Sequence, residues 1–69
     1  MKKITLEING KKKDISPVAN VRELLQLLGI TEGPVAVELN RNIIRRREWE
    51  NTPISNGDRV EIVQFVGGG

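Results

Sequence analysis

One segment with helical periodicity lies between segments in which apolar and polar residues alternate, and this pattern limits the folds open to the chain. The alternation over residues 4–8 predicts a half-buried strand. Asn9-Gly10 follows and is the strongest short hairpin signal, because both residues tolerate a positive φ. Residues 11–15 return as a more polar strand, whose lysines suit a sheet edge or a solvent face. The first part of the sequence therefore predicts a β-hairpin.

The helical segment carries signals for both of its ends. Asn20 is predicted to cap the amino terminus, with Glu23 placed three residues on to complete a capping box. Gly29 can adopt the left-handed conformation that ends a helix, and Ile30 can make the accompanying hydrophobic contact. So short a helix does not form alone in water, so a sheet must hold it. Its apolar stripe consists of Val21, Leu24, Leu25 and Leu28.

Three further strands are predicted at residues 35–39, 43–44 and 60–65. A helical turn over residues 45–51 would direct Trp49 inward. With 69 residues and no cysteine, the chain can bury only one thin aliphatic core.

The order of these elements predicts an α+β fold, with a mixed sheet of four to five strands and one main helix on one face. The first and last strands are both strongly apolar, so we expect both at the centre of the sheet. A parallel pairing of the two is the arrangement of the β-grasp (ubiquitin-like) fold. A single domain is expected over residues 1–66, followed by a flexible tail at residues 67–69.

The composition excludes most catalytic and metal sites. The chain has no histidine and no cysteine, which removes Ser-His and Cys-His catalysis together with the usual zinc sites. We therefore expect no metal and no bound cofactor. The acidic residues Glu23, Glu48 and Asp58 each adjoin an arginine, and we interpret them as solvated surface charges.

Charge and hydropathy also bear on partners and compartment. The net charge is +2, and the basic runs at 11–13 and 45–47 are not interleaved with aromatics, so a nucleic-acid partner is not expected. No apolar stretch approaches the roughly 18 residues of a membrane span. A chain without cysteine fits the cytoplasm. The run at 45–47 is either a solvated loop or a docking patch for an acidic partner.

The sequence ends in three glycines, Gly67, Gly68 and Gly69, directly after a predicted strand. Glycine-rich ends are commonly disordered, and such a tail can be inert. Alternatively, an extended tail without Cβ atoms can pass through a narrow tunnel and deliver a terminal carboxylate into another protein's active site. The second interpretation suits a chain with no catalytic side chains of its own.

These features resemble the ThiS family, the sulfur carriers of thiamin thiazole biosynthesis, which are ubiquitin-like β-grasp proteins. The resemblance covers the whole chain. Its more specific parts are the Arg46-x-Glu48-Trp49 step and the Phe-Val-Gly-Gly-Gly ending. Family members often have proline in place of Arg45 and threonine in place of Asn20, and neither departure touches the tail. The other matching segments are residues 8–10, 21–25, 35–40, 43–44 and 56–64.

The resemblance implies a carrier that acts as a co-substrate and is not an enzyme. A ThiF-like adenylyltransferase would join Gly69 to AMP, using ATP and magnesium. A persulfide charged by a cysteine desulfurase would then attack, leaving a thiocarboxylate on Gly69. Thiazole synthase, a ThiG-like enzyme, would receive the sulfur. Gly67 and Gly68 would allow close approach without steric clash.

Partner contacts are expected at Val63, Phe65, Val66 and Arg46. Val63 and Phe65 lie on the strand face opposite Val60. If that face stays open, Phe65 would anchor the activating enzyme and the synthase. The alternative is that Val63 and Phe65 pack under the helix.

Three other functions are compatible with this reading. A MoaD-like carrier for molybdopterin or another thio-metabolite would use the same chemistry at Gly69, although Glu48-Trp49 argues against it. A ubiquitin-like modifier would be joined through Gly69 to lysines of target proteins. A plain interaction module would leave the glycines inert.

Overall fold

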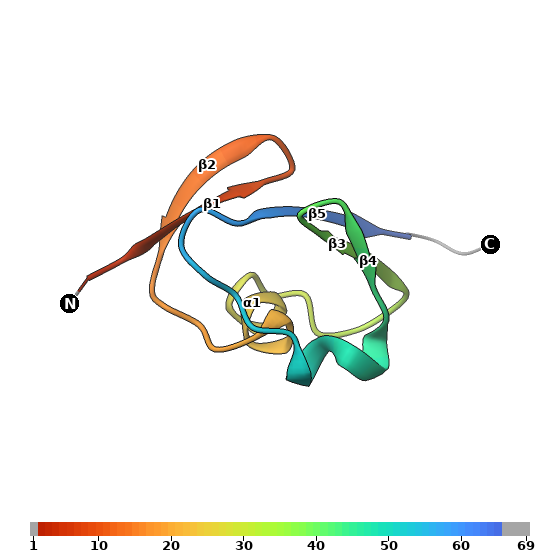
Figure 1. Ribbon diagram of the computed structural model, residues 1–69. Helices are drawn as coiled ribbons and strands as arrows, with labels where there is room; N and C mark the ends of the chain where they lie inside the picture. Colours follow the sequence, from red (N-terminus) through yellow and green to blue (C-terminus); the bar gives the residue numbers. More distant parts are fainter. Residues whose placement is uncertain (1, 66–69) are drawn as a thin grey trace.

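The computed structural model describes residues 2–65, and Figure 1 shows the arrangement of the elements. Val66 and the predicted tail at residues 67–69 lie outside the described residues. The described elements are β1 (Ile4–Ile8), β2 (Lys11–Ile15), α1 (Val21–Leu27), β3 (Val35–Leu39), β4 (Asn42–Ile44), the 3-10 helix η1 (Arg46–Asn51) and β5 (Arg59–Gln64).

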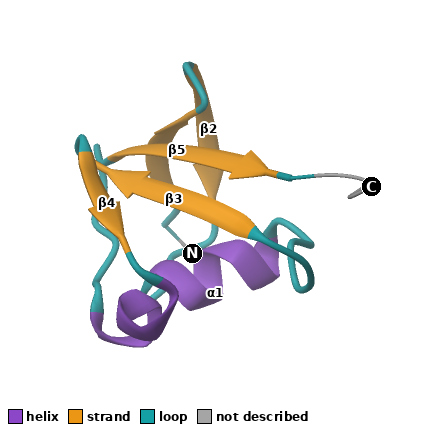
Figure 2. Ribbon diagram, turned by 90° about the vertical axis from the view of Figure 1, so that its right-hand side faces the viewer, coloured by secondary structure: helices purple, strands orange, loops and turns teal. Residues whose placement is uncertain are grey.

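Within residues 2–65 the strands form one five-stranded sheet in the order β2-β1-β5-β3-β4. β1 and β5 are parallel, with Ile8 opposite Val60, and β5 is antiparallel to β3. The predicted central, parallel pairing of the first and last strands is therefore confirmed. Figure 2 shows α1 and η1 on the same side of the sheet. This is the predicted α+β arrangement of a β-grasp fold, with five strands.

The core lies between the sheet and the two helices. Burying one aliphatic side chain contributes about 1.5–3 kcal/mol, so this layer supplies most of the favourable burial. The predicted apolar stripe of α1 is confirmed at Val21, Leu24 and Leu25, which are buried. The strands contribute the alternate residues that the sequence pattern assigns to one face. They are Leu6, Ile8, Val37, Leu39, Val60 and Ile62.

Both predicted ends of α1 are present, with one difference at the start. The Asn20 side chain accepts from the Glu23 backbone N–H at 2.9 Å, as expected of an N-cap. The Glu23 carboxylate, however, accepts from the Ala19 N–H at 2.8 Å instead of returning to Asn20. The backbone at Asn20 is extended and forms a β-bridge with Pro53. In this conformation the N–H of Ala19 faces the Glu23 carboxylate.

The carboxyl end of α1 is a Schellman motif, as predicted. Gly29 has φ +79°, and its N–H donates to the Gln26 carbonyl at 3.0 Å. The Ile30 N–H donates to the Leu25 carbonyl at 2.8 Å. Small shifts occur at strand ends elsewhere: β4 begins one residue before the prediction, and β5 begins and ends one residue earlier.

Two asparagines hold β5 from its two sides. The Asn9 side chain donates to the Ile62 carbonyl at 3.1 Å and accepts from the Ile62 N–H at 2.7 Å. The Asn40 side chain accepts from the Arg59 N–H at 2.9 Å. Both asparagines have positive φ, 50° and 49°, so they also form the turns that follow β1 and β3. Each side chain therefore extends the strand pairing beyond the backbone ladder.

We predict that Asn9→Gly destabilises the fold by about 1–3 kcal/mol, because two hydrogen bonds to β5 are lost. Glycine adopts positive φ readily, so the turn itself is preserved. Urea unfolding followed by circular dichroism measures the change. A variant as stable as the wild type would contradict the role assigned to this side chain.

Candidate functional site

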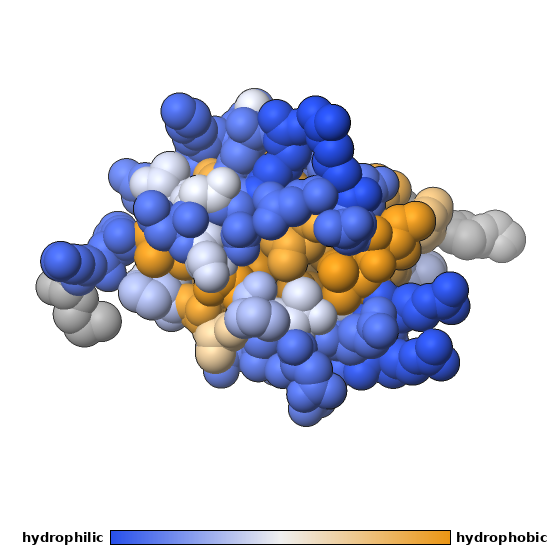
Figure 3. All heavy atoms as spheres, viewed as in Figure 1, coloured by the Kyte–Doolittle hydropathy of each residue, from blue (hydrophilic) through white to orange (hydrophobic). Residues whose placement is uncertain are grey.

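The open face of the sheet carries the exposed apolar side chains of β5. Val60 and Ile62 point into the core, so the alternating residues of β5 point outward. Val63 is 53% exposed and Phe65 is 60% exposed. The alternative in which Val63 and Phe65 pack under the helix is therefore wrong. Figure 3 shows apolar atoms at the surface close to the C-terminal end.

The strand register identifies the neighbours of Val63 on this face. Val63 lies opposite Ala36 of β3. Two residues earlier in β5, Glu61 lies opposite Glu38 of β3, and Glu38 lies opposite Ile43 of β4. Ile43 is 74% exposed. The outer face thus combines exposed apolar side chains with two glutamates placed directly across from each other.

The two glutamates are a like-charge pair across neighbouring strands. Within the described part of the chain, neither Glu38 nor Glu61 forms an ion pair. Arg59, two residues before Glu61, pairs instead with Glu7 at 2.9 Å. Like charges directly opposite one another destabilise a sheet. This pairing was not foreseen from the sequence, because the β3–β5 register was not known.

We predict that Glu61→Lys raises the free energy of unfolding by about 0.2–1 kcal/mol, because an opposite-charge pair replaces a like-charge pair. Chemical denaturation at low salt measures the effect, and added salt should reduce it. The matched control is Glu32→Lys, which makes the same change of net charge in an exposed loop. Equal shifts in the two variants would contradict a specific cross-strand effect.

The carboxylates interpreted as solvated charges have structural partners. Besides Glu23 at the start of α1, Glu48 accepts from the Arg45 N–H at 3.3 Å at the start of η1. Asp58 accepts from the Ser55 N–H at 2.8 Å and from the Asn40 side chain at 3.1 Å. These residues cap helices and turns. For Glu48 and Asp58, the sequence signal that was missed is their position three residues after the residue whose N–H they accept.

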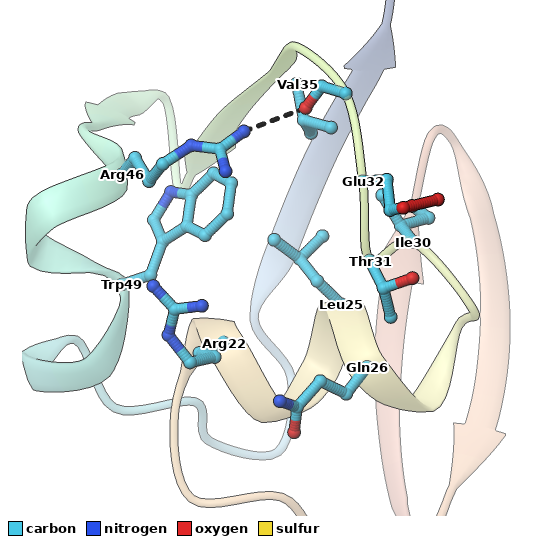
Figure 4. Close-up of a pocket in the computed structure, with 10 residues that line it drawn as sticks. Arg22, Leu25, Gln26, Ile30, Thr31, Glu32, Val35, Arg46 and Trp49 are labelled. Carbon is cyan, nitrogen blue, oxygen red and sulfur yellow. Dashed lines mark hydrogen bonds between the residues drawn. The ribbon is translucent and has the colours of Figure 1, made fainter.

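Trp49 is buried, as predicted, and forms a platform for Arg46. The indole is 5% exposed, and its N–H donates to the Ile44 carbonyl at 3.1 Å. The Arg46 guanidinium lies 4.9 Å from the ring centroid and donates to the Gly33 carbonyl at 2.8 Å (Figure 4). Arg46 is exposed, but these two contacts hold its side chain against the protein surface, on the helix side of the sheet.

A small hollow lies beside Trp49, between α1, η1 and the loop that leads to β3. Its volume is about 70 Å³, and Leu25, Ile30 and Val35 form its apolar wall (Figure 4). Pockets for small metabolites have volumes of about 300–1,000 Å³. The hollow is therefore too small for a substrate molecule of ordinary size.

Residues 2–65 offer no gathering of three acidic side chains that could hold a metal ion. In the same part of the chain, no helix is long and apolar enough to cross a membrane. The structure thus places Val63 and Phe65 together on the open face, and Arg46 on the other side of the sheet. Val66, Gly67, Gly68 and Gly69 lie outside the described residues, so their predicted roles stay predictions.

Comparison with known proteins gives a match to the model of the ThiS family over residues 5–69. The chain belongs to the ThiS family. The match includes the arginine–tryptophan step, β5 and the glycine ending. The family resemblance inferred from the sequence is therefore confirmed.

Three relatives illustrate this membership. The chain is 35% identical over 68 residues to "Sulfur carrier protein ThiS" of Bacillus subtilis, covering 93% of this chain and 98% of that protein. A crystal structure of a thiamine biosynthesis protein (ThiS) from Geobacter metallireducens superimposes with a TM-score of 0.80 at 36% identity. That match covers 96% of this chain and all of the other.

The third relative is a longer protein. "Thiazole synthase" of Paramagnetospirillum magneticum is 39% identical over 64 residues, which cover 93% of this chain. The chain spans only 20% of that protein's length. A stretch similar to this chain thus occurs within a protein that bears the name of a thiazole synthase.

Proposed function

We propose that this chain is a sulfur carrier of thiamin thiazole biosynthesis and that its reacting group is the α-carboxylate of Gly69. The observation that supports this most is the family match, which extends through the glycine ending to residue 69. The Bacillus subtilis relative of similar length is named a sulfur carrier. The chain itself has no cysteine or histidine that could hold or transfer sulfur.

The proposed chemistry activates a group that is inert by itself. At pH 7 a free α-carboxylate is an anion and a poor electrophile. Its oxygen attacks the α-phosphorus of ATP in a ThiF-like enzyme, with magnesium, and pyrophosphate leaves. The terminal sulfur of a persulfide, charged by a cysteine desulfurase, attacks the carbonyl carbon and expels AMP. A thiol then cleaves the sulfur–sulfur bond and leaves a thiocarboxylate on Gly69.

The proposed docking surface is the open face at the end of β5, formed by Val63 and Phe65. Val66, which is also proposed to contact partners, lies outside the described residues. An exposed aromatic side chain is the type of residue that dominates binding energy at interfaces. Phe65 lies four residues before Gly69, so a partner bound there has the chain end within reach. Arg46 does not line this face.

Thiazole synthase, a ThiG-like enzyme, is the proposed acceptor of the sulfur. The support is the Paramagnetospirillum magneticum protein of that name, which contains a stretch similar to this chain. When a carrier-like stretch and a synthase occur in one polypeptide, the two are expected to act in the same pathway. We place these reactions in the cytoplasm, which fits a chain without cysteine.

The test is intact-mass measurement after incubation with a ThiF-like enzyme, ATP, magnesium and a sulfur donor. We expect one oxygen to be exchanged for sulfur, with fragmentation locating the change at Gly69. Deleting Gly69 should abolish the exchange and leave the circular dichroism spectrum unchanged. An unmodified wild-type chain, or a deletion variant that unfolds, would contradict the proposal.

A separate experiment distinguishes the acceptors. Thiocarboxylated protein is offered to a thiazole synthase and to a molybdopterin synthase subunit, and loss of sulfur is followed by mass. Transfer only with the second enzyme would favour the MoaD-like alternative. Covalent bands on a denaturing gel, in the presence of candidate target proteins, would favour a protein modifier.

We predict that Phe65→Ala weakens binding to the ThiF-like enzyme at least tenfold, because an anchoring aromatic is lost. Its stability should stay within about 0.5 kcal/mol of the wild type, since the side chain is exposed. Calorimetric titration measures the affinity. Ile43→Ala is the matched control, because it removes another exposed apolar side chain from the same face. Equal losses for both would count against Phe65 as the anchor.

A further inference from the structure

The loop at residues 31–34 lies between two hydrogen bonds that come from opposite sides. Arg46 of η1 donates to the Gly33 carbonyl at 2.8 Å. The Phe65 N–H donates to the next carbonyl, that of Pro34, at 3.1 Å. Gly33 and Pro34 are consecutive, and their carbonyls lie in two neighbouring peptide planes. The proline ring fixes φ of Pro34, so the two planes can turn relative to each other only about ψ of Pro34, and the position of one carbonyl restricts the other.

The bond to Phe65 is the last hydrogen bond along the part of the chain that the structure describes. β3 and β5 pair from Leu39 opposite Val60 to Val35 opposite Gln64, and the Phe65–Pro34 bond adds one step to this ladder. Proline has no N–H, so Pro34 cannot return a hydrogen bond to β5. The direction in which the chain leaves the sheet therefore depends on where the Pro34 carbonyl is held.

Arg46 is suited to hold that loop because its own position is fixed. Its guanidinium stacks on Trp49, which is buried and hydrogen-bonded to Ile44. A planar guanidinium can stack on an aromatic ring while donating in its own plane, which a lysine ammonium cannot do. The loop itself is exposed, and Gly33 has φ +84°. Because glycine adopts positive and negative φ about equally, Gly33 alone does not fix the conformation of the loop.

We propose that Arg46 is a positioning residue, which sets the point and direction at which the chain leaves β5, and is not a residue that contacts the activating enzyme. Through Trp49, Arg46 and the Gly33–Pro34 loop, the helix side of the protein determines where Phe65 lies. This role accounts for the Arg46-x-Glu48-Trp49 step: Glu48 caps η1, Trp49 forms the platform and Arg46 holds the loop. Its functional consequence rests on the proposed activation of Gly69.

The first test uses the isolated protein. Amide hydrogen exchange is measured by NMR for the wild type, Arg46→Gln, Arg46→Lys and the control Arg47→Gln. Arg46→Gln should speed exchange of the Phe65 amide roughly two- to tenfold, as expected for the loss of one supporting hydrogen bond. The Val60 and Ile62 amides should not change, and Arg47→Gln should match the wild type. Unchanged exchange at Phe65 in Arg46→Gln would overturn the proposal.

The second test separates positioning from partner contact. With a ThiF-like enzyme, Arg46→Gln should lower kcat/KM for adenylation about two- to tenfold, because the docking residue Phe65 and the chain end after it are placed less precisely. Arg46→Lys should restore part of this loss. A weaker binding constant with normal Phe65 exchange would instead make Arg46 a partner contact and overturn the proposal. If the wild-type chain is not adenylated at all, the proposed function fails, while the exchange measurement still decides the role of Arg46.

Discussion

β5 reaches the middle of the sheet because hydrogen bonds hold it on both sides, and two of the groups involved are asparagine side chains. The parallel pairing with β1 is only two residues long, and Asn9 lengthens it by pairing with Ile62. On the other side, the side chain of Asn40 contributes at Arg59. This placement puts Val60 and Ile62 in the core and turns Val63 and Phe65 toward solvent. It also leads the chain out of the sheet next to the loop before β3 (Figure 2).

The two faces of the sheet differ in composition and burial. The helix side is filled by aliphatic residues and Trp49, and its hollow is too small for a metabolite. The open side carries exposed apolar residues beside a pair of opposed glutamates. Residues that lower the stability of a fold, as two opposed glutamates do, are often found where a protein needs them for function. The chain thus combines a helix-covered aliphatic layer with an open face that carries exposed apolar and acidic side chains.

Much of the fold could be predicted because the turn, cap and periodicity signals in the sequence all favoured the same arrangement of strands and helix. The turn at Asn9-Gly10, the caps of α1 and the alternation in β5 each specify a conformation within a few residues. Hydrogen bonds between distant residues could not be predicted in this way. Nothing local shows that the Asn9 side chain reaches Ile62, or that Glu38 faces Glu61, because both depend on register. The sequence predicts Arg46 as a partner contact, and nothing local shows that its side chain also reaches Trp49 and Gly33.

The position of β5 in the sequence also affects how the protein is made. β5 follows every other described element along the chain, yet it separates β1 from β3 in the sheet. Until residues 59–64 have been synthesised, the β1–β2 and β3–β4 hairpins each present an edge that lacks its partner strand. Open edges of this kind promote aggregation. A growing chain is therefore most exposed to misassembly just before β5 emerges, which favours rapid completion of synthesis or protection by chaperones.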